Sequence, residues 1–173
     1  MEIRSLEPRD RDAMERFFAR VPEGDRTFFK ENVDDPEVVA RWVGPGTGRF
    51  IAVEDDTVVG SAALVPLTGW SSHVAELRVV VDPGHRGRGV GRALARHAVL
   101  EALNLGLKKL VVEVIADQES AIGLFRSLGF DPEALLKDHV RDQSGELRDL
   151  MILAHAVEES YRAMAAAGLA ESV

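Results

Sequence analysis

The chain has 173 residues, which is enough for one domain with a substantial core and too few for two large domains. A formal net charge of −8 argues against general nucleic-acid binding and suits a cationic amine as a ligand, although an acidic surface also serves solubility. Cysteine is absent, which excludes disulfides and metal thiolates, and we expect no metal site. No apolar run reaches the roughly 20 residues that span a bilayer, and the N-terminus is unlike a signal peptide, so we expect a cytoplasmic protein without a membrane partner.

The N-terminal segment predicts a strand followed by a helix. Residues 2–6 have the pattern of a short strand, and a helix follows from Pro8 to about residue 20. Its apolar positions recur at helical spacing and indicate a buried stripe, made of Ala13, Met14, Phe17, Phe18 and Val21. Residues 22–32 are expected to be irregular. Phe28 and Phe29 within them either pack over the first helix or line a pocket.

A second helix and a hairpin come next. Asp35 supplies a capping carboxylate and Pro36 suits the first helical position, so a helix begins here. Residues 49–54 and 57–67 predict two strands joined at a tight turn, most simply as an antiparallel hairpin.

The centre of the chain combines a strand, a glycine-rich loop and a helix. Residues 74–81 end in three β-branched valines, residues 82–84 have turn chemistry, and a helical pattern runs from about residue 89 to residue 105. Glycines let backbone N–H groups approach a ligand closely, and a helix N-terminus attracts phosphate. A dinucleotide-binding loop is disfavoured because Arg92 stands at its last glycine position, and an NTPase loop is disfavoured because no lysine follows.

The C-terminal part predicts a strand, a short helix, a hairpin and a final helix. Residues 109–116 form a nearly continuous β-branched run, as in a strand that is covered on both faces. A short helix carries Ala121, Leu124, Phe125 and Leu128 on one face. Residues 135–141 and 146–154 predict the last hairpin, and the Ala- and Glu-rich end predicts a helix over about 156–170.

Two of these motifs resemble one family. The pattern R-x-x-G-x-G at Arg86, Gly89 and Gly91 is similar to the acetyl-coenzyme A loop of the GCN5-related N-acetyltransferases (GNATs). Residues 121–130, AIGLFRSLGF, resemble the A-x-x-L-Y-x-x-L-G-F helix that follows the fifth strand in these enzymes. The order of predicted elements agrees over most of the chain.

The resemblance implies a fold and a coenzyme site. The fold class is α/β (α+β): one N-acetyltransferase domain over residues 1–173, with a core at about 1–155 and a C-terminal helix. A mixed, mostly antiparallel sheet of about seven strands is flanked by helices, and its central parallel strands splay apart. Acetyl-coenzyme A would be a co-substrate that binds through Val79, Val80, Val81, Arg86, Gly87, Arg88, Gly89, Val90, Gly91, Arg92, Gln118 and Phe125.

Two glutamates are candidates for the catalytic base. An amine acceptor is protonated near neutral pH, so a carboxylate must remove its proton before it attacks the thioester directly. Glu76 and Glu113 lie where members of the superfamily carry such a glutamate. Glu113 is expected to be the more buried and to have the more elevated pKa. The alternative for either residue is a structural carboxylate paired with an arginine such as Arg78.

The sequence departs from the family at two positions. Gln118 stands where asparagine is common, and Phe125 stands where a tyrosine commonly protonates the leaving thiolate; the chain's one tyrosine, Tyr161, is distant. The main expectation is an enzyme that acetylates a primary amine of a protein or a small molecule. The alternatives are a non-catalytic acyl-coenzyme A sensor or interaction module, and a loop that binds another anion. A homodimer is compatible with the sequence.

Overall fold

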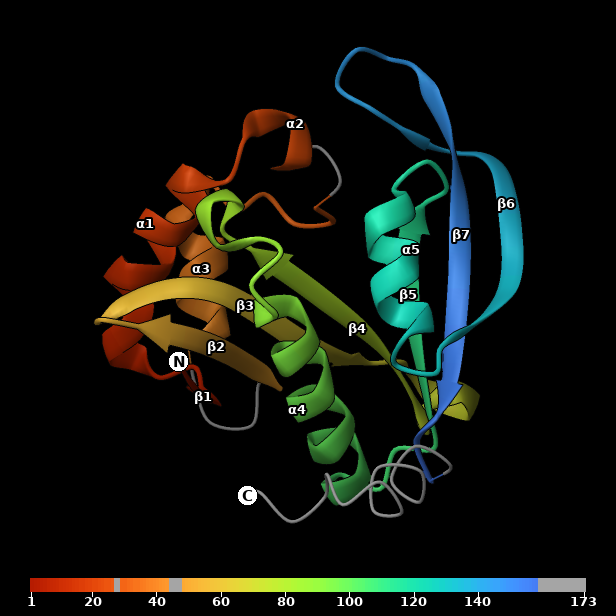
Figure 1. The fold of residues 1–173 in the computed structure, drawn as a ribbon, viewed down its shortest axis with the longest axis horizontal. Helices are drawn as coiled ribbons and strands as arrows, with labels where there is room; N and C mark the ends of the chain where they lie inside the picture. Colours follow the sequence, from red (N-terminus) through yellow and green to blue (C-terminus); the bar gives the residue numbers. More distant parts are fainter. Residues whose placement is uncertain (27–28, 44–47, 159–173) are drawn as a thin grey trace.

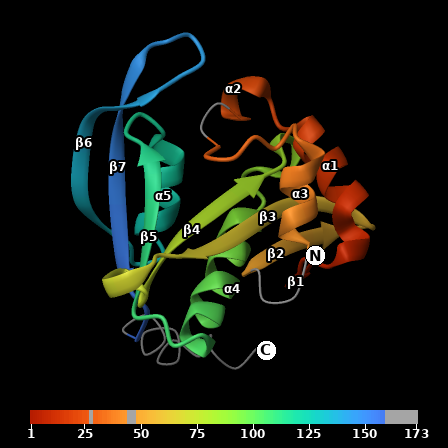
Figure 2. The same cartoon turned by 180° about the vertical axis from the view of Figure 1, so that it is seen from behind.

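A single open sheet of seven strands organises the molecule (Figures 1 and 2). The computed structural model describes residues 1–26, 29–43 and 48–158. The strand order is β1-β2-β3-β4-β5-β7-β6, and neighbours are antiparallel except for the central pair β4 and β5. The strands are β1 (Glu2–Ser5), β2 (Arg49–Glu54), β3 (Thr57–Pro66), β4 (Val74–Val81), β5 (Lys109–Ile115), β6 (Asp131–Arg141) and β7 (Leu147–Ala156).

Helices cover both faces of the sheet. On one face lie α1 (Arg11–Arg20) and α3 (Pro36–Trp42), and on the other lie α4 (Val90–Asn104) and α5 (Glu119–Arg126). Adjacent residues of β2 show the division, because Ile51 belongs to the core under α1 and α3 whereas Phe50 belongs to the core under α4. The predicted stripe of the first helix is confirmed, with Met14 and Phe17 fully buried.

The two central strands separate soon after they meet, as Figure 1 shows. Parallel pairing of β4 with β5 is limited to Val74–Glu76 opposite Lys109–Val111. Beyond these residues β4 continues to Val81 and β5 continues to Ile115, so a gap opens between them. The expected mixed sheet with splayed central parallel strands is therefore confirmed.

Three boundaries differ from the sequence prediction. Residues 22–32 contain a short helix, α2 (Glu23–Arg26), where irregular chain was expected. The strand β6 begins at Asp131, four residues earlier than predicted, because its first residues pair with β7 although their side chains are exposed and give no core pattern. At the other end β7 extends through Ala156, and the chain is helical at residues 157 and 158, one residue later than the predicted start of the C-terminal helix. The rest of that prediction, with Tyr161, lies outside the described residues.

The strand β5 is less covered than its apolar sequence suggests. Its side chains alternate between buried and partly exposed, and Glu113 is exposed. The less covered residues are Lys109, Val111 and Glu113, which share one face of the strand, and Glu113 lines the cavity beside β4. Over the described part of the chain, no helix is both long and apolar enough to cross a bilayer.

Candidate functional site

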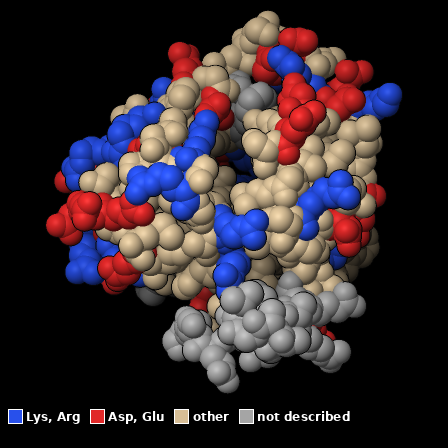
Figure 3. Space-filling view, viewed as in Figure 1, with Lys and Arg blue, Asp and Glu red and all other residues tan. Residues whose placement is uncertain are grey.

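A cavity of about 940 Å³ occupies the gap between β4 and β5. Figure 3 shows the same face hollowed near its centre, with Lys and Arg side chains beside the hollow. The cavity runs from the glycine-rich loop, along the end of β4, to the carboxylates on β4 and β5. Of the residues predicted for the site, those that line it are Glu76, Val79, Val80, Val81, Arg86, Gly87, Gly89, Val90, Gly91, Arg92, Glu113, Gln118 and Phe125.

The loop that closes one end of the cavity is held by a buried aspartate. Asp82 follows the last residue of β4, accepts hydrogen bonds from Gly84 N (2.9 Å) and Arg20 Nε (2.5 Å), and thereby ties the loop to α1. Desolvation alone would raise the pKa of Asp82, but these hydrogen bonds and the charge of Arg20 outweigh it and lower the pKa. The start of the loop is therefore fixed by a paired carboxylate.

Glycine is required in the loop by backbone geometry. Gly87 and Gly89 have φ of 72° and 86°, which side-chain-bearing residues rarely adopt, and a Cβ at either would meet nothing within 4 Å. The first backbone bond of α4 is donated by Ala93 to Gly89 O at 3.0 Å, so the N–H groups of residues 90–92 precede the helical ladder. Together these features give an open backbone surface with unpaired donors, which suits phosphate.

The three loop arginines have different surroundings. Arg86 donates to Val81 O (3.4 Å) and to Asp25 (2.5 Å), and Arg92 donates to Ser127 Oγ (2.9 Å); both line the cavity. Arg88 does not line it, because its guanidinium pairs with Glu54 of β2 at 3.1 Å. Its predicted role in coenzyme binding stays a prediction.

The two candidate bases lie on opposite sides of the gap and share one cation. Lys30 Nζ is 2.9 Å from Glu76 on β4 and 2.8 Å from Glu113 on β5. Glu76 also accepts from Arg78 Nη2 at 3.0 Å, so the expected alternative of an arginine-paired carboxylate is realised at this residue. The structure thus brings both glutamates to one place, around an ammonium group.

The expected burial of the glutamates is wrong. The Glu76 side chain is 10% exposed and that of Glu113 is 27% exposed, because Glu113 faces the open gap. Desolvation is the largest influence on Glu76 and would raise its pKa, but Arg78 and Lys30 lower the pKa below its usual value. Burial opposes the charge of Lys30, whereas Glu113 and Glu76 favour it, and the pKa of Lys30 is raised overall. Ion pairing outweighs burial here.

A charged network that the sequence did not reveal supports this arrangement. Glu31 accepts from Arg78 Nη1 (3.1 Å), Arg49 Nη2 (3.2 Å) and Trp42 Nε1 (3.1 Å). The Arg49 guanidinium also lies 3.9 Å from the Trp42 ring centroid, and burial lowers the pKa of Arg49. Lys30 and Glu31 belong to a segment without periodicity, so no local pattern could have indicated their position.

The start of α5 forms the other wall. Gln118 precedes the helix and Phe125 lies near its end, packed edge-on against Phe130 at 5.4 Å between ring centroids. Phe125 is buried and apolar, so it offers no proton to a group in the cavity. The cavity wall at Phe125 therefore carries a phenyl ring and no hydroxyl group.

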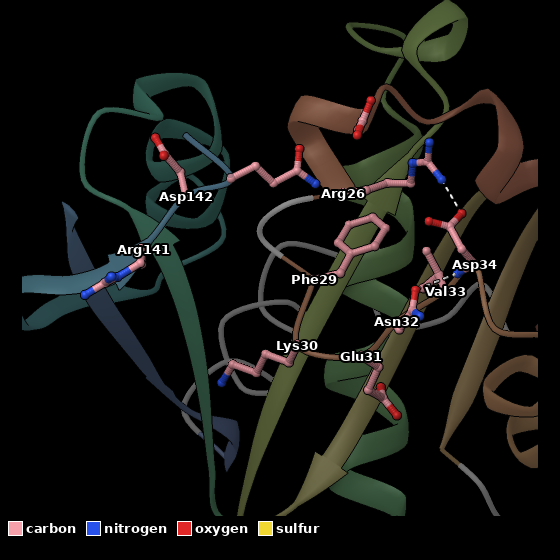
Figure 4. Close-up of a pocket in the computed structure, with 11 residues that line it drawn as sticks. Arg26, Phe29, Lys30, Glu31, Asn32, Val33, Asp34, Arg141 and Asp142 are labelled. Carbon is pink, nitrogen blue, oxygen red and sulfur yellow. Dashed lines mark hydrogen bonds and ion pairs between the residues drawn. The ribbon is translucent and has the colours of Figure 1, made fainter. Parts of the chain in front are cut away.

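A second opening of about 440 Å³ adjoins the first and shares Phe29, Lys30, Glu31 and Val33 with it. Figure 4 shows Arg26 and residues 29–34 on one side, and on the other Arg141 at the end of β6 and Asp142 in the turn that follows. Lys30 and Glu31 point in different directions from the chain. Phe29 contacts Phe18 edge-on at 5.7 Å, so both predicted roles of this residue, packing over α1 and lining a pocket, are met; Phe28 is outside the described residues.

Comparisons with known proteins agree with this geometry. The N-acetyltransferase YjgM of Escherichia coli is 34% identical over 88 residues, which cover 50% of this chain and 53% of that protein. The chain thus matches about half the length of the curated relatives. A ribosomal-protein-alanine N-acetyltransferase from Brucella melitensis has a TM-score of 0.79 at 25% identity, covering 90% of this chain and 99% of that one.

A further solved structure shares the fold. It is yncA of Salmonella typhimurium, described as a putative acetyltransferase with its cofactor acetyl-CoA, with a TM-score of 0.81 and 22% identity over 91% of this chain and 94% of that one. The profile of the acetyltransferase (GNAT) family matches residues 10–130, which include α1, the glycine-rich loop, both glutamates and α5. The chain therefore belongs to the GNAT acetyltransferase family.

Proposed function

We propose that this protein transfers the acetyl group of acetyl-coenzyme A to a primary amine. The observation that carries the proposal is one continuous cavity with an anion-binding loop at one end and two carboxylates around an ammonium group at the other. The first end suits a diphosphate and the second suits an amine. The family membership supports the same reaction class.

The coenzyme would be held mainly by backbone groups. Its diphosphate would accept hydrogen bonds from the N–H groups at the start of α4, with Arg86 and Arg92 adding charge. Its pantetheine arm would lie along Val79–Val81, whose edge toward β5 has no strand partner in the described sheet. The Gln118 amide lines the same cavity and would hydrogen-bond the arm.

Glu113 is better suited than Glu76 to act as the base. Both carboxylates contact the same ammonium position, but Glu76 is also paired with Arg78, whose permanent charge makes the carboxylate a weaker proton acceptor. Glu113 would take the proton from the acceptor ammonium, and Glu76 would hold the ammonium in place. The neutral nitrogen then attacks the thioester carbonyl directly, since the chain has no cysteine to carry the acyl group.

The leaving thiolate does not need a tyrosine. A thiol has a pKa of about 8.5, so it departs as a reasonably stable anion and is protonated by solvent. Phe125 instead keeps this wall apolar. The acceptor would enter through the opening between residues 29–34 and residues 141–143, which charged side chains of both signs line.

The test is acetyl transfer itself. The purified protein is incubated with acetyl-coenzyme A and a panel of amines that contains peptides with a free N-terminus, lysine peptides and small polyamines, while free thiol is followed. Thiol release that depends on the amine supports the proposal. The amine that gives the fastest thiol release identifies the acceptor class.

Phe125 favours a second candidate, a non-catalytic acyl-coenzyme A sensor. A cavity that binds the coenzyme without an acid beside the thiol could serve recognition alone. Saturable binding of acetyl-coenzyme A without thiol release on every amine of the panel would identify this function.

A further inference from the structure

Lys30 Nζ stands where an acceptor amine would have to stand. It lies between carboxylates from two strands, at 2.9 Å from Glu76 and 2.8 Å from Glu113, and so bridges the gap into which the acyl arm would point. A structural ion pair needs one carboxylate, whereas this ammonium is held by both candidate catalytic groups. In Figure 4 the side chain extends away from its own segment.

We propose that Lys30 is an acetyl acceptor within its own chain, so that the protein acetylates itself at this residue. The proposal rests on the proposed function, because it needs acetyl-coenzyme A in the cavity. It goes beyond that function because it assigns a modification site. It also names the acceptor as a lysine ε-ammonium on its flexible four-carbon chain.

The step balances with groups that are present. The Lys30 ammonium gives one proton to Glu113, and the neutral nitrogen forms a bond to the thioester carbonyl carbon. The carbon–sulfur bond breaks, the thiolate leaves, and the second nitrogen proton is lost as the amide forms. One proton returns to the thiolate and one goes to solvent. The products are N-acetyl-lysine and free coenzyme A.

The other lysines provide the contrast. The chain has four lysines, Lys30, Lys108, Lys109 and Lys137, and of these Lys30 lines the cavity. Lys109 is a matched control, because its side chain is 37% exposed against 43% for Lys30, and it also pairs with a carboxylate, Glu133, at 2.6 Å. Ordinary chemical acetylation would modify Lys30 and Lys109 similarly, whereas acetylation by the site would select Lys30.

Acetylation would change the site. The product amide carries no charge and cannot form ion pairs with Glu76 and Glu113, which would then face each other without a cation between them. An external acceptor must displace the same ion pairs when Lys30 is unmodified. Lys30 would therefore act as an internal competitor, and its acetylation would end that competition.

The experiment maps acetylated lysines by mass spectrometry after incubation with acetyl-coenzyme A. We expect acetyl-Lys30 to form at least tenfold faster than acetyl-Lys109, and this excess to disappear in Glu113→Gln. The acetylated fraction should not depend on protein concentration. When isotope-labelled Glu113→Gln protein is mixed with the unlabelled native chain, the native chain alone should acquire the modification at Lys30.

The outcomes separate this inference from the proposed function. If calorimetry detects coenzyme binding and external amines are acetylated while Lys30 is modified no faster than Lys109, the inference is wrong and the proposed function stands. If the coenzyme does not bind, both fail. Lys30→Arg keeps the positive charge and should abolish the fast modification while Lys109→Arg leaves it intact; fast labelling that persists in Lys30→Arg would contradict the assignment.

Discussion

The Arg78 guanidinium donates to the Glu76 carboxylate at 3.0 Å, so Glu76 reaches the cavity already paired with a permanent charge. Within the part of the chain that the structure describes, no arginine pairs with Glu113, and its carboxylate faces the cavity. The difference in surroundings divides the roles of two otherwise identical side chains. It also yields a prediction that can be tested with isosteric amides.

Glu113→Gln should lower kcat by about 10²- to 10⁴-fold, the usual contribution of a general base. Glu76→Gln should raise KM for the acceptor more than it lowers kcat, because its role is to hold the ammonium. Steady-state kinetics with the best amine of the panel would separate the two variants. Equal losses of kcat in both would contradict this division of roles.

Asp82→Asn should destabilise the protein at neutral pH by about 2 kcal/mol, because the hydrogen bond from Arg20 is charge-assisted and the carboxylate that accepts it is buried. The folded state lowers the pKa of Asp82, so its contribution is fully present above the unfolded value of about 3.9. The contribution is lost as the pH falls through the lower folded value. Denaturant unfolding at neutral pH and near pH 3 would measure this.

The control for Asp82 is Asp131→Asn on the exposed start of β6, which should change stability by less than about 0.5 kcal/mol. The difference in unfolding free energy between the native chain and Asp82→Asn should decrease as the pH is lowered. If this difference stays constant or increases at low pH, the charge of the Asp82 carboxylate is not what holds the loop.

Gly60→Ala should disturb the site from a distance. A Cβ at Gly60 would lie 2.8 Å from Leu94 Cδ1 and 2.9 Å from Val90 Cγ1, so these two buried side chains of α4 would have to shift. We expect a cost of about 1–3 kcal/mol and weaker binding of acetyl-coenzyme A. Thermal unfolding and calorimetry would show both effects.

Gly123→Ala is the matched comparison. Gly123 lies within α5, its Cβ would meet nothing within 4 Å, and alanine is the better helix former by about 1 kcal/mol. This variant should be as stable as the native chain or more stable. If both substitutions had the same effect, close packing of β3 against α4 would not be the cause.

The sequence was sufficient for the main features of the fold. The capping aspartate predicted at Asp35 accepts from Glu37 N at 2.9 Å, and the hairpin of β2 and β3 pairs as expected. The glycine-rich loop was recognisable because positive φ values restrict Gly87 and Gly89 to glycine. These are local requirements of the backbone, and they can be predicted from a few neighbouring residues.

The centre of the site could not be predicted in the same way. Strand alternation indicates that Glu76 and Arg78 share a face, but it does not reveal that Lys30 comes from 46 residues upstream to pair with Glu76. The burial of Glu113 was misjudged because an apolar strand sequence does not show where the neighbouring strand diverges. Such features depend on tertiary contacts.

The central claim is that the loop at residues 86–92 binds the diphosphate of acetyl-coenzyme A, and calorimetric titration tests it most directly. Gly89→Ala and Gly145→Ala both force alanine into positive φ, at 86° and 88°, but Gly89 lines the cavity whereas Gly145, in the β6–β7 turn, does not. We predict saturable one-to-one binding by the native chain and by Gly145→Ala, and binding at least tenfold weaker by Gly89→Ala. No heat of binding with the native chain, or equal affinity in all three proteins, would contradict the account.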